Sequence, residues 1–451
     1  MSKKTKQKKA TPRLRFPEFR EAKGWNLERL SSRGGFLPSL TGKTASDFDR
    51  GDASFIPYMN VFSNAFTDKQ DLRAVDVKAG ERQNAVAKGD VFFTVSSETP
   101  EDAGMSSVLV EDIEKCYLNS FCALFRFNDD ESPNPLFLGH LLRTSVVRKH
   151  LARGAQGATR YNISKGTFRD IPILLPTPDE QHKIASCLGT LDDWIDAESR
   201  ALAALRRHKT GLMQQLFPRP GQTRPRLRFP EFQDAGEWEV SAFDSLYEFK
   251  PTNNYSRDQL NYNAGTVKNI HYGDIHTRFA TSFRVNEEAV PYVNADALPD
   301  ELNPDLFCQP GEVIFADASE DVADVGKCIE VVEVGEQQVL SGSHTIRARP
   351  LKESIVVGFG GYLFKSAGVR KTIEKEAQGS KVTQISAKRL ATVDVCHPKD
   401  LAEQSRIATC LASLDARLAA QAEKLASLGR HKRGLMQQLF PSAENSSRSG
   451  G

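Results

Sequence analysis

The sequence predicts an α+β fold in which two similar mixed-β domains are separated by two long antiparallel coiled-coil helices, related by a pseudo-twofold internal repeat. Three observations predict it. Two blocks of sequence occur twice, both copies of one block carry a heptad pattern, and short apolar runs broken by Gly, Asn and Asp fill the regions between them. The 451 residues are enough for two or three domains, each with its own core.

The internal repeat is identical in two places. Residues 12–19 recur as 225–232, and residues 211–218 recur as 434–441. Looser matches join these blocks, so the two halves share one design while the residues between the matches have diverged. Because 225–232 follows the first helix, we expect 12–19 to lie beside the end of the second helix, which makes the molecule pseudo-circular.

The region from 180 to 217 carries a heptad seam that recurs 223 residues later, with two polar interruptions in each copy, at Glu198 and Lys209 and at Gln421 and Lys432. Such seams pack best against each other, and their polar positions fix the register. The alternative is two ordinary amphipathic surface helices. The predicted core positions are Ile184, Leu188, Leu191, Ile195, Leu202, Leu205, Leu212, Leu216, Ile407, Leu411, Leu414, Leu418, Leu425, Leu428, Leu435 and Leu439.

These patterns divide the chain into six segments. They are a basic disordered tail at 1–12, a variable domain at 13–176, a helical region at 177–218, a second variable domain at 219–396, a helical region at 397–441 and a disordered tail at 442–451. Each variable domain is expected to hold short strands and one helix, at 136–153 and 358–376.

The composition excludes several classes of protein. The 60 Lys and Arg residues nearly balance the 58 Asp and Glu residues, and the net charge of +2 lacks the basic excess of a typical nucleic-acid-binding domain. The seven cysteines form no C-x-x-C pair, so neither a disulfide framework nor a zinc site is indicated. No apolar run approaches the ~18–20 residues that span a bilayer. We expect a cytoplasmic protein with no bound metal and no membrane contact.

One polar loop in each half carries side chains that hydrogen-bond to base edges and phosphates. The alternative is a polar surface loop without a ligand. Because the loop recurs in both halves with different polar residues, a role in binding is favoured. The candidates are Gln156, Thr159, Arg160, Tyr161 and Asn162 in the first half, and Gln378, Lys381, Thr383 and Gln384 in the second.

A Ser-Glu pair also recurs, as Ser97 and Glu98 and as Ser319 and Glu320. Each pair is a candidate to accept a hydrogen bond from cytosine N4 or to orient a basic neighbour, and the alternative is that it caps a turn.

A third candidate set aligns in the two halves, with Tyr58 and Asn60 in the first and Tyr272, Asp274 and His276 in the second. A shared metal or catalytic site is not expected there, because the first half has no His or Asp at these places. Base readout or turn chemistry remains.

The sequence contains no complete copy of several common catalytic motifs. Residues 41–44 resemble the end of a P-loop, but the first glycine of that motif would fall on Leu37. The sequence has no Gly-x-Ser-x-Gly elbow and no element by which amino-methyltransferases hold their target base. No acidic cluster with Lys recurs in both halves, so the chain is not expected to be an enzyme.

Over nearly its whole length the chain resembles the specificity (S) subunits of type I restriction-modification systems. The residues that carry the resemblance are the two copies of 12–19 with Trp25 and Trp238, the sequence 171–176 with Glu180 and Gln181, and the two copies of 211–218. The second half departs from the pattern at 393–398, which leaves its strand-to-helix junction open.

The resemblance implies a non-catalytic subunit whose two target recognition domains bind a bipartite, asymmetric DNA sequence, one half-site each. It implies docking of two methyltransferase (M) subunits that methylate adenine N6, and of restriction (R) subunits. No cofactor is expected in this chain, whereas S-adenosylmethionine, ATP and Mg are expected on the partner subunits. The paired helices would act as a ruler and as the docking surface.

Two rival functions remain open. One is a DNA-sensing adaptor of another defence system, and the other is a coiled-coil scaffold that binds no DNA. The balanced charge leads us to expect modest DNA affinity for the isolated chain.

Overall fold

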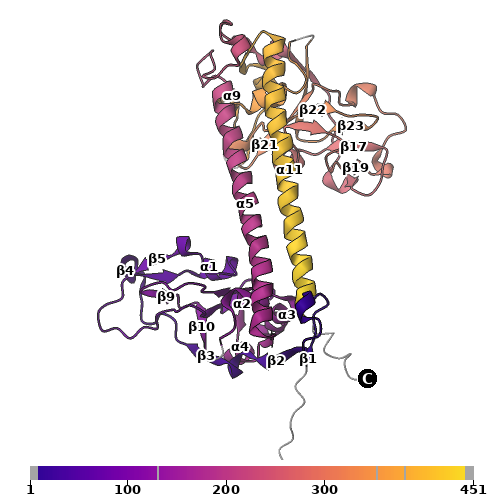
Figure 1. The fold of residues 1–451 in the computed structure, drawn as a ribbon. Helices are drawn as coiled ribbons and strands as arrows, with labels where there is room; N and C mark the ends of the chain where they lie inside the picture. Colours follow the sequence, from indigo (N-terminus) through magenta and orange to yellow (C-terminus); the bar gives the residue numbers. More distant parts are fainter. Residues whose placement is uncertain (1–8, 129–131, 352–353, 380–381, 442–451) are drawn as a thin grey trace, which may run out of the picture. The chain divides into compact units, whose positions relative to one another are not determined.

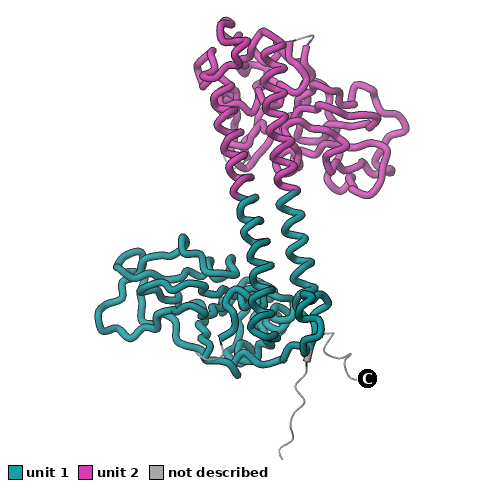
Figure 2. Tube along the Cα trace, viewed as in Figure 1, with its two compact units in different colours: residues 1–199, 424–451 teal, residues 200–423 magenta. Residues whose placement is uncertain are grey.

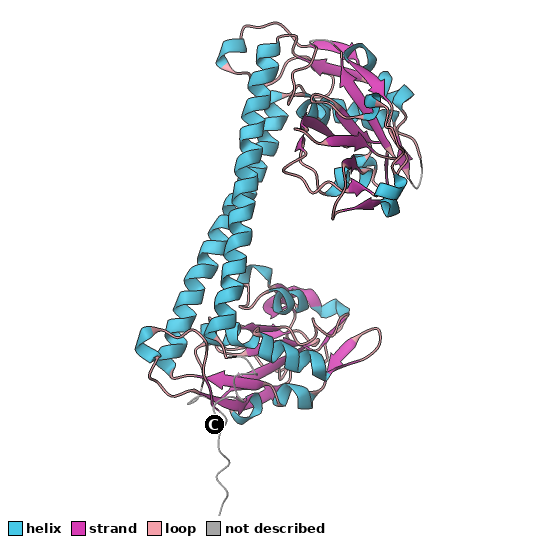
Figure 3. Cartoon of the chain, turned by 90° about the vertical axis from the view of Figure 1, so that its right-hand side faces the viewer, coloured by secondary structure: helices cyan, strands magenta, loops and turns pink. Residues whose placement is uncertain are grey.

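The computed structural model describes residues 9–128, 132–351, 354–379 and 382–441. It divides into two compact units, unit 1 formed by 1–199 with 424–451 and unit 2 formed by 200–423 (Figure 2). Each unit mixes helices and strands (Figure 3), so the predicted α+β class is confirmed.

The described residues of unit 1 form small sheets with the strand orders β1-β2-β13, β3-β10-β6-β8, β11-β12-β7 and β5-β4-β9. Its strands are β1 (Lys9–Ala10), β2 (Trp25–Arg29), β3 (Gly34–Leu37), β4 (Phe48–Ile56), β5 (Arg73–Val75), β6 (Val91–Thr94), β7 (Ser96–Ser97), β8 (Ser106–Val108), β9 (Cys116–Leu118), β10 (Cys122–Phe127), β11 (Ala155–Gln156), β12 (Tyr161–Ile163) and β13 (Pro172–Leu175). Its short helices are α1 (Tyr58–Ser63), α2 (Pro135–Leu142), α3 (Ser145–Gly154) and α4 (Lys165–Arg169) (Figure 1).

Unit 2 repeats this plan with strand orders β14-β26, β15-β24-β20-β22-β18, β16-β19-β17-β23 and β21-β25. Its strands are β14 (Glu239–Ala242), β15 (Tyr247–Lys250), β16 (Leu260–Asn261), β17 (Val267–Ile270), β18 (Ser282–Arg284), β19 (Tyr292–Val293), β20 (Val313–Ala316), β21 (Ala318–Ser319), β22 (Cys328–Glu333), β23 (Gln338–Ser341), β24 (Thr345–Pro350), β25 (Thr383–Gln384) and β26 (Asp394–His397). Its short helices are α6 (Phe243–Leu246), α7 (Tyr272–Thr277), α8 (Gly360–Lys365), α9 (Ala367–Glu376) and α10 (Ala387–Ala391).

The core of each unit forms around one fully buried strand. All four residues of β6 and all four of β20 are buried, which is the pattern of a strand covered on both faces. β6 pairs with β10 and β20 pairs with β24 in the same antiparallel arrangement. The central strand pair of the two domains is therefore the same, as the repeat predicts.

The prediction of a single helix at 136–153 and at 358–376 is wrong in both variable domains. The segment 136–153 forms α2 and α3, and 358–376 forms α8 and α9, with the breaks at Thr144 and Ser366. Both break residues are extended, with ψ of 156° and 146°. Ser and Thr bond to nearby backbone groups and so compete with helix continuation, and the Thr144 hydroxyl donates to the Leu141 carbonyl at 2.7 Å.

The two long helices are α5 (Pro178–Leu216) and α11 (Leu401–Leu439), each of 39 residues. Every predicted seam position is buried or partly buried. In unit 1 the start of α5, with Ile184 and Leu188, shares a core cluster with Leu439 at the end of α11. In unit 2 the end of α5, at Leu216, shares one with Ile407 at the start of α11. Each unit therefore confirms antiparallel packing.

Charged pairs form at the polar interruptions of the seam. Lys209 binds Asp415 in unit 2, and Lys432 binds Asp192 at the equivalent place in unit 1. Glu198 accepts a hydrogen bond from Lys424 Nζ at 2.5 Å. A one-turn slip would separate these partners, so the pairs support the predicted role in register.

The junction that the sequence left open is resolved. Two residues separate β13 from α5, and three separate β26 from α11. The strand and the helix are therefore both present in the second half, and the single added residue lies in the connection.

The pseudo-circular arrangement is confirmed by two matched backbone hydrogen bonds. Leu14 N donates to Gln438 O at 3.0 Å in unit 1, and Leu227 N donates to Gln215 O at 2.9 Å in unit 2. Each copy of the 12–19 block thus lies beside the last turn of a long helix, as the repeat predicts.

Candidate nucleic-acid interface

The polar loop of the first half is a hairpin that joins β11 to β12. β12 pairs on its other side with β7, so Tyr161 lies opposite Ser97. The hairpin needs a glycine at its tip, because Gly157 has φ of 144° and a Cβ there would lie 2.1 Å from the Arg160 carbonyl oxygen. The polar loop and the Ser-Glu pair, which the sequence gives separately, form one surface.

Side chains of unit 1 tie this surface together at Ser96. Tyr58 Oη donates to the Ser96 carbonyl at 2.6 Å, and Arg160 Nε donates to the Ser96 hydroxyl at 3.2 Å. Burial raises the pKa of Tyr58, so its hydroxyl stays protonated at neutral pH. The exposed members of the set are Glu98, Gln156, Thr159, Arg160 and Asn162.

Unit 2 builds the same surface from different side chains. Ala318 lies opposite Gln384 and Ser319 lies opposite Thr383 in the β21-β25 pair. His276 Nε2 lies 3.1 Å from the Ala318 carbonyl, the counterpart of the Ser96 carbonyl. The hairpin glycine is Gly379, with φ of 130°.

In unit 2 the candidate residues differ in their exposure to solvent. Glu320, Gln378 and Gln384 are exposed, Ser319 is half-buried, and Thr383 is buried. Lys381 lies outside the described residues.

Two of the aligned candidates, Asn60 and Asp274, are buried and bind other groups of the protein. Asn60 is fully buried, and its amide nitrogen donates to the carbonyls of Asp68 and Asp71 at 2.8 and 3.1 Å. Asp274 is 3% exposed and binds Arg257 at 2.7 Å. Both side chains hold loops in this structure, whereas the neighbouring Tyr272 is half-buried.

Sequence reasoning missed the arginine that holds each Ser-Glu loop. Arg148 donates to the carbonyls of Ala103 and Gly104, both at 2.7 Å. Arg370, its counterpart 222 residues later, donates to those of Ala323 and Val325 at 2.9 and 2.7 Å. The repeat offset was the signal that could have paired them.

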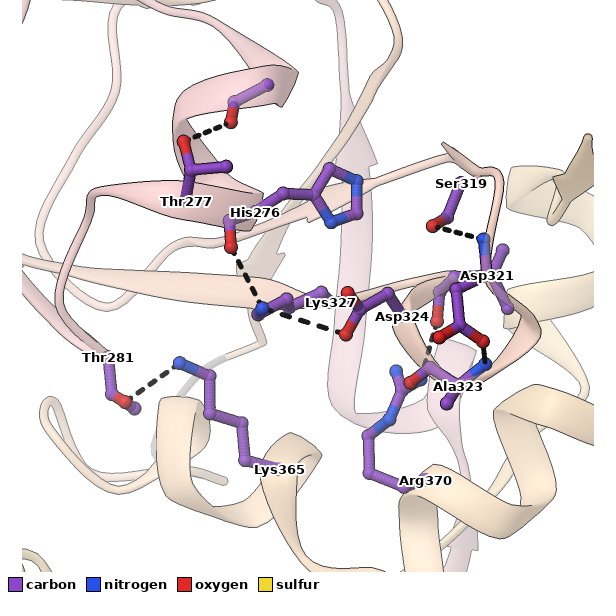
Figure 4. A network of polar contacts seen from close by, with 12 residues as sticks. His276, Thr277, Thr281, Ser319, Asp321, Ala323, Asp324, Lys327, Lys365 and Arg370 are labelled. Atoms are coloured by element: carbon purple, nitrogen blue, oxygen red, sulfur yellow. Dashed lines mark hydrogen bonds and ion pairs between the residues drawn. The ribbon is translucent and has the colours of Figure 1, made fainter. Parts of the chain in front are cut away.

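Figure 4 shows the unit 2 network that surrounds this arginine. Lys327 Nζ donates to the His276 carbonyl at 2.9 Å and lies 3.6 Å from an Asp324 carboxylate oxygen. The short helix α7 and the loop after β21 are thereby joined, so the side chains on both are placed by one set of contacts.

A second duplicated surface lies at the ends of the long helices. A groove of about 440 Å³ lies at the end of α11 in unit 1, and one of about 370 Å³ lies at the end of α5 in unit 2. The equivalent lining residues are Arg13 and Arg226, Met436 and Met213, Gln437 and Gln214, Phe440 and Phe217, and Pro441 and Pro218.

No group of three or more His, Cys, Asp or Glu side chains is placed to hold a metal ion within the part of the chain that the structure describes. No described helix combines the length and the apolar character that crossing a membrane requires.

Known proteins resemble the chain in sequence over part of its length. The family model for the type I restriction modification DNA specificity domain matches residues 34–207. The type I restriction enzyme StySPI specificity subunit from Salmonella potsdam is 25% identical over 181 residues, which cover 40% of this chain and 38% of the relative. The EcoKI specificity subunit from Escherichia coli K12 is 24% identical over 180 residues, covering 39% and 37%. The chain thus matches little more than a third of either relative.

Solved structures resemble nearly the whole chain. The type I restriction-modification S subunit from M. genitalium matches with a TM-score of 0.55 at 15% identity, over 96% of this chain and 99% of that one. A chain from a structure on complex assembly and conformational transition of the type I R-M system matches with 0.53 at 18% identity, over 93% and 98%. At such identities the likeness shows the fold. The sequence matches confirm the resemblance to the specificity subunits.

Proposed function

We propose that the chain, whose residues 34–207 match the type I restriction modification DNA specificity domain, is a specificity subunit like those it resembles. In this role it reads a bipartite, asymmetric DNA sequence, one half-site per unit. One observation carries the proposal. Each unit presents the same hairpin-and-strand surface, but with Arg160 and Asn162 in one and Gln378 and Gln384 in the other. Equal backbones with unequal polar side chains suit two different base sequences.

Mapping methylated adenines in the host genome tests this function. Deletion of the gene is expected to abolish methylation at one two-part motif, and the intact gene is expected to restore it. If no bipartite motif disappears while the methyltransferase gene is expressed, the specificity function is rejected.

We also propose that two methyltransferase subunits dock at the duplicated grooves. The support is that each unit carries an equivalent groove with Met and Phe side chains beside arginines, which suits an apolar segment flanked by carboxylates. S-adenosylmethionine would be held by those subunits, and ATP and Mg by the restriction subunits. The chain itself supplies sequence recognition and assembly.

Native mass spectrometry of the reconstituted complex tests the docking. Met436→Glu and Met213→Glu are each expected to remove one methyltransferase subunit from a two-to-one assembly, and the double variant to remove both. His431→Glu, at an exposed position of α11, is the control. Retention of two subunits by the double variant would exclude the grooves.

Binding at several salt concentrations separates the rival functions. A DNA-binding complex must lose affinity as salt rises, because phosphate contacts release counterions. A scaffold would bind no DNA at any salt. An adaptor of another defence system would bind DNA in the absence of a methylated motif.

A further inference from the structure

The turn that leads into the central antiparallel strand carries an exposed side chain in both units. In unit 1 it is Phe121, directly before β10, and in unit 2 it is His344, directly before β24. Phe121 is 63% exposed, and the His344 side chain is 54% exposed. A single exposed apolar residue is common on proteins, so exposure alone carries no argument.

The two residues occupy the same place in the candidate interface. Val95 N donates to the Phe121 carbonyl at 3.3 Å, and the Val95 carbonyl accepts from Ile163 N at 2.9 Å. Asp317 repeats both bonds, donating to the His344 carbonyl at 3.1 Å and accepting from Ile385 N at 2.8 Å. One residue thus joins each turn to the hairpin strand of the candidate interface.

His344 carries two further signs of a built position. Its φ is 56°, a left-handed conformation that costs free energy in a residue other than glycine. Its ring lies 5.3 Å from that of Tyr272, and its Nδ1 lies 3.3 Å from an Asp317 carboxylate oxygen. The Nε2 atom of an imidazole that carries its proton on Nδ1 is a hydrogen-bond acceptor. Nε2 makes no hydrogen bond within the described residues.

We propose that Phe121 and His344 are specificity-determining residues, each contacting one base pair of the half-site that its unit reads. Phe121 contacts a thymine C5-methyl group, since aromatic carbon is a partner of that group in the major groove. His344 Nε2 accepts a hydrogen bond from the exocyclic amino group of adenine or cytosine. This inference rests on the proposed function, and it assigns a base class to one position in each half-site.

The test is a binding selection from randomised duplexes, with the full chain assembled with its methyltransferase subunits. Phe121→Ala is expected to reduce the preference at one base pair of one half-site by about 5- to 150-fold, and His344→Asn to do so in the other half-site. Asn is chosen because it tolerates the left-handed conformation. Leu136→Ala, an exposed apolar position on α2, and His208→Asn, an exposed histidine on α5, are the matched controls.

A gain-of-function variant guards against loss by misfolding. Phe121→His is expected to move the preference at its base pair from thymine to a base with an amino group. Unchanged preferences at every position in Phe121→Ala and His344→Asn would overturn the inference while the wild-type motif persists. If the wild-type complex selects no motif, the proposed function fails, and the inference fails with it.

Discussion

Arg15 and Glu180 lie 165 residues apart in the sequence and form a buried bidentate ion pair. Arg15 Nε and Nη2 donate to the two carboxylate oxygens at 2.7 and 2.6 Å, and Trp25 Nε1 donates to one of them at 3.2 Å. Arg228 and Glu403 repeat the pair in unit 2. The repeated 12–19 block and the glutamate near the start of each long helix therefore form the same buried contact in both units.

Glu180→Ala is expected to destabilise unit 1 by about 3–5 kcal/mol, because it leaves the Arg15 guanidinium buried without its partner. Glu18→Ala is the control, since that carboxylate pairs with Lys183 at the surface, where water and salt screen the ion pair and its loss has little effect on stability. Urea unfolding of the full chain measures both. Equal losses in the two variants would contradict a special role for the buried pair.

Arg370→Ala is expected to loosen the loop after β21, because two carbonyls lose a charged donor. Hydrogen exchange of residues 321–327 should accelerate by about tenfold or more, which corresponds to about 1.4 kcal/mol. Lys388→Ala, at an exposed position of α10, should leave the loop unchanged. If residues 321–327 still exchange slowly in Arg370→Ala, the contacts of Lys327 and Asp324 are enough to hold the loop.

Unit 2 is expected to lose stability as the pH rises from about 4.5 to about 7. Burial raises the pKa of Glu330 to about 7 from an ordinary 4.5, although Gly358 and Gly361 donate to its carboxylate. In that window the folded state holds a proton that the unfolded state has released, so stability falls, by on the order of 3 kcal/mol in total. The stabilisation that protonated Glu330 contributes is fully present below pH 4.5, the pKa of this group in the unfolded chain.

Thermal unfolding between pH 4.5 and 8 measures this dependence. Glu330→Gln should flatten the pH profile of unit 2, whereas Glu320→Gln, at an exposed position, should leave it unchanged. A profile of the same slope in Glu330→Gln would assign the titration to another group.

Arg160→Ala is expected to weaken DNA binding by the assembled complex and to lower the salt slope of log K by about 1, if its guanidinium contacts a phosphate. Arg153→Ala, at an exposed position on α3, is the charge-matched control. Binding of labelled duplex over a range of salt concentrations measures the slopes. Equal slopes for both variants would show that only net charge matters.

The isolated chain is expected to bind DNA more weakly than the complex, because its net charge is only +2 and methyltransferase subunits would share the phosphate contacts. The same titration, with and without those subunits, measures the difference. Equal affinities would contradict the expectation.

Patterns of short range and of exact repetition were predictable. The seam positions and the place of residues 12–19 follow from spacing and identity, since these depend on neighbours or on comparison of the two halves. The helix breaks were not predictable, because extended conformations at Thr144 and Ser366 are set by the packing around them.

The repeat and the hydrophobic spacing are enough to identify a duplicated α+β chain with two matched helices and two polar loops of differing content. Which polar residues meet at each surface depends on how the chain folds. It placed the Ser-Glu strand beside the hairpin, enclosed Asn60 and Asp274, and exposed Phe121 and His344. The physical reason is that burial and hydrogen-bond partners depend on residues distant in sequence, which local spacing does not encode.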